Sequence, residues 1–160
     1  MKKRRSKHYF STEPGMPEPI SVDVKRRLAF SEVDAMAIAW HGNYPRFFEA
    51  AHTELMQKIG LGFQNYADVN VGAPMVQCHV DYHSPLMLDE AFTVRAELFW
   101  NEGARLDIAY TVTGSDGRIC ATGYTVQMFC GLDDHAPCIF PPPVAARMRE
   151  RWQNGEFYQG

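Results

Sequence analysis

The sequence predicts an α+β fold in which a curved antiparallel sheet of about five strands wraps around one long central helix. One segment, from Tyr44 to Ile59, repeats its apolar residues at helical spacing, while the segments around it alternate apolar and polar residues as strands do. The strands after the helix follow one another through short turns, which favours antiparallel pairing. One apolar helix face and one apolar sheet face bury each other, so we expect two layers.

Length and composition exclude several classes of protein. The chain has 160 residues, enough for one domain with a substantial core. Its net charge is −3, which argues against a general nucleic-acid-binding protein. No apolar run approaches the roughly 18 residues that a membrane span needs. The four cysteines form no C-x-x-C pair and no export signal is evident, so we expect reduced thiols and a cytoplasmic location.

The chain divides into three expected parts. Residues 1–19 begin with the basic run MKKRR and continue through STEPGMPEP, a composition typical of a flexible arm. Residues 20–153 are expected to form a single folded domain, and residues 154–160 a short tail. A tether to phospholipid or nucleic acid is the alternative interpretation of the basic start.

The first strand and the helix are expected in succession. A strand over residues 21–30 places on one face Val22, Val24, Leu28 and Phe30. Residues 31–43 connect it to the helix. The buried stripe of that helix is expected to consist of Tyr44, Phe47, Phe48, Ala51, Leu55 and Ile59. Asn43 is the expected N-terminal cap, and Gly60 ends the helix.

The remainder of the chain is expected to form strands and one terminal helix. The expected strands are residues 73–82, 91–100, 105–113 and 119–132. On the buried face of the first of them we expect Val76, Cys78, Val80 and Tyr82. The GSDG sequence at 114–117 is a hairpin signal, because Asp-Gly readily adopts positive φ. Residues 144–152 are expected to form a short helix, and Cys78 and Cys120 to be small core residues.

The stretch VDAMAIAWHGNYPRFFEAAHTELMQKIGL, residues 33–61, resembles the active-site segment of the 4-hydroxybenzoyl-CoA thioesterase-like family of hotdog-fold acyl-CoA thioesterases. The family pattern is an Asp, small residues, an aromatic, His or Tyr, a small residue, Asn-Tyr, and a helix with Phe-Glu and Thr-Glu. It is carried here by Asp34, Trp40, His41, Gly42, Asn43, Tyr44, Phe48, Glu49, Thr53 and Glu54. VDYHSPLMLDE, residues 80–90, is similar to a second family segment. The resemblance covers roughly residues 21–132.

Two positions depart from the family pattern. The family usually has glycine where Ala37 stands, so a backbone with φ > 0 at this point would be unfavourable for this chain. The family usually has arginine where His52 stands, which affects a contact on the helix surface rather than the chemistry.

The resemblance implies hydrolysis of an acyl-CoA, or of an acyl group on an acyl carrier protein, with no cofactor beyond the CoA or phosphopantetheine of the substrate. Asp34 is the implied nucleophile or general base. A backbone amide near His41, at the positive end of the helix, would polarise the thioester carbonyl. The His41 side chain is expected either to position water or substrate or to form only a local hydrogen bond at the helix start. The competing interpretation of Asp34 is a turn-capping acid.

Neighbouring residues are assigned by the same resemblance. The residues expected to contact substrate are Trp40, Gly42, Asn43 and Tyr44. Glu49 is the alternative catalytic carboxylate, because a related hotdog branch uses an acid on the helix. The candidate cations for the CoA phosphates are Arg95, Arg105 and Arg118, but the favoured interpretation of each is a solvated strand or turn residue. The family implies a homodimer or a homotetramer built as a dimer of dimers, with which an exposed Phe99 would be consistent.

Three alternatives belong to other functional classes. His79, Asp81 and His83 alternate along a strand and share one face, a donor set that suits iron or zinc; the favoured interpretation is a polar outer face and no metal. A hotdog dehydratase would use a histidine with an acid from a partner subunit. A non-catalytic module would bind acyl thioesters and leave them intact.

Overall fold

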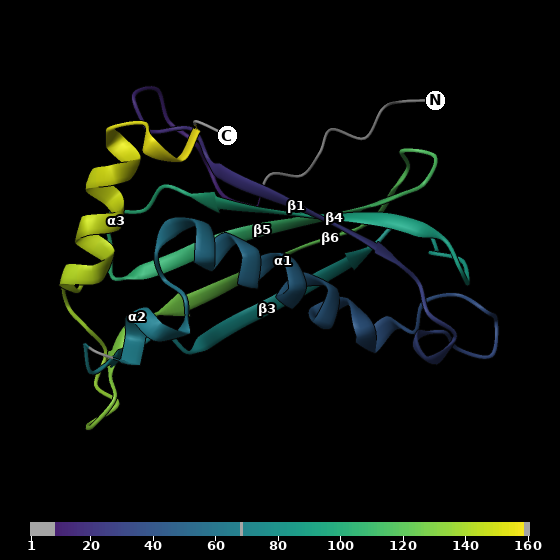
Figure 1. Cartoon of the computed structure of the whole chain (residues 1–160), viewed down its shortest axis with the longest axis horizontal. Coiled ribbons are helices and arrows are strands. Elements are labelled where there is room, and N and C mark those ends of the chain that lie inside the picture. Colours follow the sequence, from purple (N-terminus) through teal and green to yellow (C-terminus); the bar gives the residue numbers. More distant parts are fainter. Residues whose placement is uncertain (1–8, 68, 159–160) are drawn as a thin grey trace.

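The computed structural model describes residues 9–67 and 69–158, and its central element is a five-stranded antiparallel sheet. The strands lie in the order β1-β4-β5-β6-β3. Their bounds are β1 Ile20–Arg27, β3 Met75–Tyr82, β4 Ala91–Phe99, β5 Arg105–Gly114 and β6 Ile119–Met128. A second sheet of two short strands pairs β2, Val71–Gly72, with β7, Cys130–Gly131. Helix α1 lies across one face of the large sheet, which confirms the two expected layers (Figure 1).

Helix α1, Tyr44–Ile59, has the expected bounds and the expected buried stripe. Its six predicted apolar residues are all buried, and Phe48 stacks on Tyr110 of β5 with ring centroids 4.5 Å apart. The sheet admits this ring because Gly123 of β6 has no side chain: a Cβ there would lie 2.6 Å from Phe48. Gly60 ends the helix with φ +76°, a conformation that glycine adopts at little cost.

Two further helices lie at the end of the sheet distant from the N-terminus of α1 (Figure 1). Helix α2, Phe63–Ala67, follows α1, and α3, Pro143–Gln153, confirms the expected terminal helix. Trp152 of α3 is buried against Trp100. The described part of the expected tail, residues 154–158, is packed as well, because Phe157 is buried and the Tyr158 hydroxyl donates to the Glu18 carbonyl.

Strand β3 departs from the expected meander. It pairs with β6 rather than with β4, so β3 forms one edge of the sheet and β1 forms the other. Val76, Cys78 and Tyr82 were expected to be buried, but all three are exposed. The reason is position: α1 packs chiefly over β1 and β4 and leaves the β3 edge of the single chain uncovered.

Three smaller expectations are corrected. Strand β1 ends at Arg27, and Phe30 begins a short 3₁₀ turn in which it is 81% exposed. The long last strand is interrupted at Phe129, which separates β6 from β7. Phe99 is buried rather than exposed, because Phe10 packs against it with ring centroids 5.6 Å apart.

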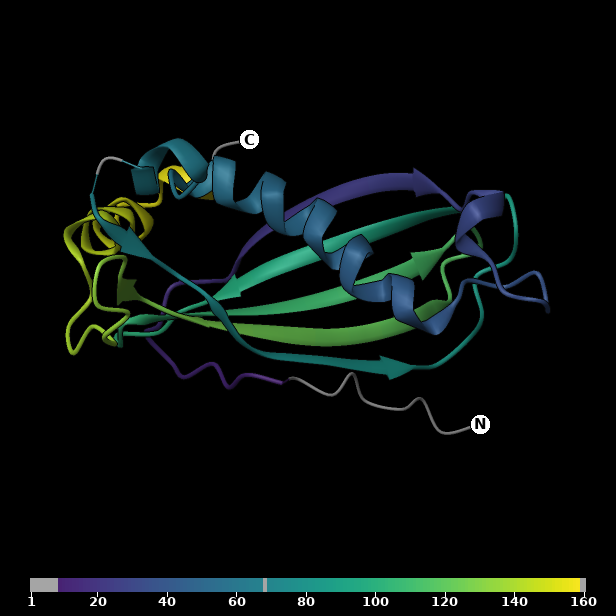
Figure 2. The ribbon, with the colours of Figure 1, turned by 90° about the horizontal axis from the view of Figure 1, so that it is seen from below.

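The segment expected to be a flexible arm is anchored at Tyr9 and Phe10. The chain from about residue 9 runs along the sheet face opposite α1 (Figure 2). The Tyr9 hydroxyl donates to Asp81 at 2.6 Å, and its ring lies against His79 and Tyr124. The arm is therefore fastened to the outer face of β3 and β6; the basic run at residues 1–5 lies outside the described residues.

Candidate active site

Asp34 lies in a tight hairpin loop between Val33 and Ala39, which pair with each other. The Asp34 amide donates to the Ile38 carbonyl at 2.9 Å, and the Ala37 amide donates to the Asp34 carbonyl at 3.0 Å. Ala37 has φ +58°, so this loop does require the left-handed conformation for which the family uses glycine. These bonds fix the backbone from which the Asp34 carboxylate projects.

The two carboxylate oxygens of Asp34 have different surroundings. Oδ1 accepts a hydrogen bond from the Met36 amide at 2.8 Å, which is the capping interaction of an Asx turn. Among the described residues no hydrogen bond or ion pair to Oδ2 is recorded. The capping role therefore occupies one oxygen and orients the side chain, while the second oxygen remains available to a substrate or a water molecule.

Asp34 lines a cavity of about 380 Å³ together with the start of α1 and the end of β3. The other lining residues are Met36, Ile38, Ala39, His41, Tyr44, Tyr82, His83, Ser84 and Pro85. The cavity is apolar on most of its wall, and Tyr44 and Tyr82 meet edge to face with ring centroids 5.1 Å apart. Burial raises the pKa of Tyr44 to about 12 and also raises the pKa of Tyr82, so both phenols keep their protons at neutral pH.

The chain enters α1 through a 3₁₀ turn, His41–Asn43. The Asn43 amide donates to the Trp40 carbonyl at 3.0 Å, which is the first hydrogen bond of this turn. The amides of His41 and Gly42 precede it and so have no acceptor within the helix. They provide the donors, and the helix provides the partial positive charge, that suit a developing oxyanion.

The structure brings together part of the predicted site. Asp34, His41 and Tyr44 all line the cavity. Trp40 does not line it; its ring lies over Gly42 instead, at 2.4 Å from where a Cβ would be. Asn43 is buried but forms no side-chain cap, because its backbone is already helical (φ −84°, ψ −16°) rather than extended as at a cap; its side-chain nitrogen donates to the Glu32 carbonyl at 2.8 Å. Asn43 therefore holds the connecting segment against the helix start.

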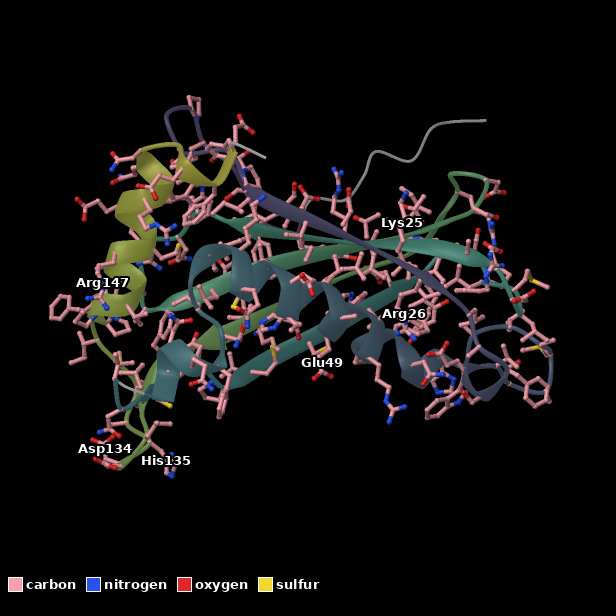
Figure 3. All side chains as sticks on the ribbon, in the orientation of Figure 1. Lys25, Arg26, Glu49, Asp134, His135 and Arg147 are labelled. Atoms are coloured by element: carbon pink, nitrogen blue, oxygen red, sulfur yellow. The ribbon has the colours of Figure 1, made fainter. Side chains whose placement is uncertain are left out.

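The rival carboxylate and the candidate metal ligands lie elsewhere. Glu49 is exposed in the middle of α1 and does not line the cavity; Figure 3 shows its side chain projecting outward from the helix. His79 pairs with Asp81 at 3.0 Å, while His83 contacts Thr122 at 2.8 Å. Within residues 9–67 and 69–158 no group of three or more metal-ligating side chains is found.

The three candidate phosphate ligands each have an acidic neighbour. Arg95 pairs with Asp23, Arg105 with Asp107 and Arg118 with Glu90, at 2.7–2.8 Å. These ion pairs are sufficient to explain the three arginines as structural residues.

Sequence reasoning missed the β3 side of the cavity. Tyr82 was expected to be a core residue and His83 a possible metal ligand, yet both line the cavity beside Ser84 and Pro85. The available signal was the second resembling segment, residues 80–90, which begins in the same strand.

No helix among the described residues is both long and apolar enough to cross a membrane.

Comparison with known proteins gives consistent results. The sequence model of the thioesterase-like superfamily matches residues 28–148. A putative esterase of Aquifex aeolicus (strain VF5) is 32% identical over 74 residues, which span 46% of this chain and 58% of that protein. The 4-hydroxybenzoyl-CoA thioesterase of Pseudomonas sp. (strain CBS-3) is 24% identical over 120 residues, 71% of this chain and 85% of that enzyme.

A solved structure extends the likeness to three dimensions. A hypothetical protein from Staphylococcus aureus, solved in complex with CoA, superposes with a TM-score of 0.74 at 17% identity and covers 89% of each chain. At this identity the likeness shows the fold, which is the hotdog fold that the resemblance implied.

Proposed function

The chain belongs to the thioesterase-like superfamily, and from this premise we propose that it is an acyl-CoA thioesterase in which Asp34 is the catalytic carboxylate. The observation that carries the proposal is the second carboxylate oxygen of Asp34: Oδ1 accepts the Met36 amide, Oδ2 has no hydrogen-bond or ion-pair partner among the described residues, and Asp34 lines the same cavity as the helix start. The same hydrolysis applies to an acyl group on CoA or on an acyl carrier protein, because both present a phosphopantetheine thioester. The reaction consumes water and requires no cofactor.

The carboxylate and the helix start act on the same carbonyl. The amides of His41 and Gly42 stabilise the negative charge that develops on the thioester oxygen. Asp34 either attacks the carbonyl carbon, expelling the thiolate and leaving an acyl anhydride that water hydrolyses, or removes a proton from the attacking water. In both routes the departing thiolate takes up a proton that the water supplies, so the thiol and the free acid are released. The His41 side chain, also on the cavity wall, positions the water or the substrate.

Asp34→Asn tests the assignment. We expect thiol release by the wild type from at least one member of a panel of short, long and aromatic CoA thioesters. The variant keeps the shape and the Oδ1 acceptor, so the loop is preserved, but it has neither a nucleophilic oxygen nor a base. We expect a loss of about 10²-fold or more in kcat, the scale of a positioned acid–base group.

Asp134→Asn is the matched control. Asp134 Oδ1 accepts the Ala136 amide at 2.9 Å, the same Asx turn, and the next residue, His135, also has positive φ. Figure 3 shows Asp134 in a loop far from α1's first turn. Activity of Asp134→Asn should equal that of the wild type. Wild-type activity in both variants would show that Asp34 is only a capping acid and would make Glu49 the next candidate for the catalytic carboxylate.

The two routes differ in where solvent oxygen is incorporated. Turnover in H₂¹⁸O by the nucleophilic route passes oxygen into the Asp34 carboxylate when water attacks the anhydride at that carbon, whereas the general-base route labels only the released acid. Label found by mass spectrometry in the peptide that contains Asp34 identifies the nucleophilic route, whereas label in the released acid alone results from the general-base route or from attack at the acyl carbon. Binding of acyl-CoA without thiol release would instead favour the acyl-binding module or the dehydratase.

We further propose that the chain forms a homodimer through the β3 edge, and that it acts in the cytoplasm. Support comes from β3 itself, an edge strand with unpaired backbone groups and exposed Val76 and Tyr82. The cavity opens beside the same strand through Tyr82, so a partner at this edge would complete its wall.

A further inference from the structure

The carbonyl of His41 lacks the donor that an α-helix normally supplies. In a helix each carbonyl accepts from the amide four residues further along, and here that residue is Pro45, which has no N–H. The His41 oxygen instead accepts a hydrogen bond from the Tyr82 hydroxyl at 2.7 Å. Since Tyr82 is the last residue of β3, this single bond joins the helix start to the edge of the sheet.

The bond has a consequence for the next amide. The His41 carbonyl and the Gly42 N–H belong to one planar trans peptide unit and point in opposite directions. A donor that fixes the carbonyl therefore fixes the direction of the Gly42 N–H. It also polarises the peptide unit, which strengthens that N–H as a donor. The preceding unit is fixed separately, by the bond from the Asn43 amide to the Trp40 carbonyl.

We propose that Tyr82 is a positioning residue that aims the Gly42 amide, beside the His41 amide, at the oxygen of the thioester carbonyl. The inference rests on the proposed thioesterase activity and adds to it the side chain that orients one of the two oxyanion donors. Tyr82 does not need to touch the reacting atoms, because it acts through the His41–Gly42 peptide.

Two contacts restrict the orientations that the His41–Gly42 peptide unit can adopt. On one side, the Trp40 ring leaves no room for a Cβ at Gly42. On the other, the Tyr82 ring packs edge-on against Tyr44, which is buried in the first turn of α1. The Tyr82 ring is thus placed by packing and its hydroxyl by the carbonyl, so the two contributions can be separated by mutation.

Tyr82→Phe is the test, because it keeps the ring and removes only the hydroxyl. An oxyanion donor acts mainly in the transition state, so we expect kcat to fall about 10- to 100-fold while KM changes less than about twofold. Amide hydrogen exchange supplies a readout independent of activity: exchange should accelerate at the Asn43 amide, the hydrogen-bonded amide of this turn, and stay unchanged in β5. A variant that merely loosened substrate binding would raise KM and leave kcat intact.

Tyr66→Phe is the matched control. Tyr66 lies in α2, at the other end of α1, and its buried hydroxyl has no hydrogen-bond partner among the described residues. It should match the wild type in kcat and in exchange at the Asn43 amide. An unchanged kcat for Tyr82→Phe, in an enzyme that Asp34→Asn inactivates, would overturn the role of Tyr82 and leave the proposed function standing. If the wild type releases no thiol at all, the proposed function fails, and unchanged exchange in Tyr82→Phe would overturn the positioning role as well.

Discussion

At the scale of the residue, Ala37 holds a backbone conformation that costs the native state free energy. Its φ of +58° brings the Cβ close to neighbouring backbone atoms, a strain of roughly 1–2 kcal/mol in L-residues other than glycine. The loop adopts this conformation because three hydrogen bonds between residues 34 and 38 close around it. The strain therefore lies in the hairpin loop that carries Asp34.

Ala37→Gly should relieve that strain. Glycine loses more backbone entropy on folding, which offsets part of the gain, so the expected net stabilisation is about 0.5–1 kcal/mol. Urea unfolding monitored by circular dichroism measures it. Ala35→Gly, in the same loop but without positive φ, should destabilise by a similar amount; the opposite order of the two variants would contradict the strain.

The sequence predicts the site residues near Asp34 well and those contributed by β3 poorly. The spacing from Asp34 to Tyr44 is local, so a motif records it, and Asp34, His41 and Tyr44 are found together on the cavity wall. Tyr82 reaches the same wall only because β3 lies at the edge of the sheet. Strand order is decided by pairing between distant segments, which periodicity along one segment does not encode. Asn43 was misassigned because the 3₁₀ turn His41–Asn43 precedes α1, so Asn43 already has helical backbone angles and does not take the extended conformation of a cap.

At the scale of the element, one ion pair holds the loop that follows β3. Arg118, immediately before β6, donates to Glu90 and to the Pro85 carbonyl, both at 2.7 Å. Glu90 also accepts the amides of Met87 and Ser115. The hydrogen bond from Arg118 is the main cause that lowers the pKa of Glu90. Pro85 lines the cavity, so this pair stabilises part of its wall.

Arg118→Met should weaken the fold in a pH-dependent way. The native pKa of Glu90 lies below its unfolded value of about 4.3. The ion pair therefore stabilises the native state fully at pH values above this unfolded pKa, and its contribution is lost as the pH falls through the native pKa. We expect a loss of about 1–3 kcal/mol at pH 7, because a carboxylate that is only 9% exposed loses its main donor. Unfolding free energies measured from pH 3 to pH 8 should converge with the wild type at the acid end.

Arg95→Met provides the contrast. It breaks an ion pair with Asp23 in which both side chains are about half exposed, so it should cost less than about 1 kcal/mol. Equal costs for the two variants would show that burial does not distinguish the pairs.

At the scale of the whole molecule, the two faces of the sheet are closed by different means. Helix α1 covers one face, and the N-terminal segment with Tyr9 and Phe10 crosses the other (Figure 2). At the β3 edge alternating residues contact opposite faces of the sheet: Asp81 accepts a hydrogen bond from Tyr9 of the N-terminal segment, and Tyr82 donates one to the His41 carbonyl at the helix start. The helix, the sheet and the hairpin could be predicted because each has its own periodicity; the anchored segment could not, because two aromatic residues in a polar stretch carry no periodic signal.

Val76→Lys tests the proposed homodimer. Val76 is 50% exposed on β3 in the single chain and would be buried by a partner at this edge, so a charge there should shift the protein to monomer at micromolar concentration and reduce thioesterase activity. Sedimentation velocity measures the change. Ile139→Lys, which places the same charge at an 85% exposed apolar residue outside β3, should leave the mass unchanged. Dissociation by Ile139→Lys alone would place the interface elsewhere.

Pro45 and Tyr82 both determine how the His41 carbonyl is satisfied, which makes these two distant positions dependent on each other over evolutionary time. A proline in the first turn removes an amide, and a phenol from another strand replaces it. A related chain with an ordinary residue at the position of Pro45 would regain its own donor, and selection on the tyrosine would relax. Substitution at one position should therefore accompany substitution at the other, a correlation that a collection of related sequences would reveal without any experiment on this protein.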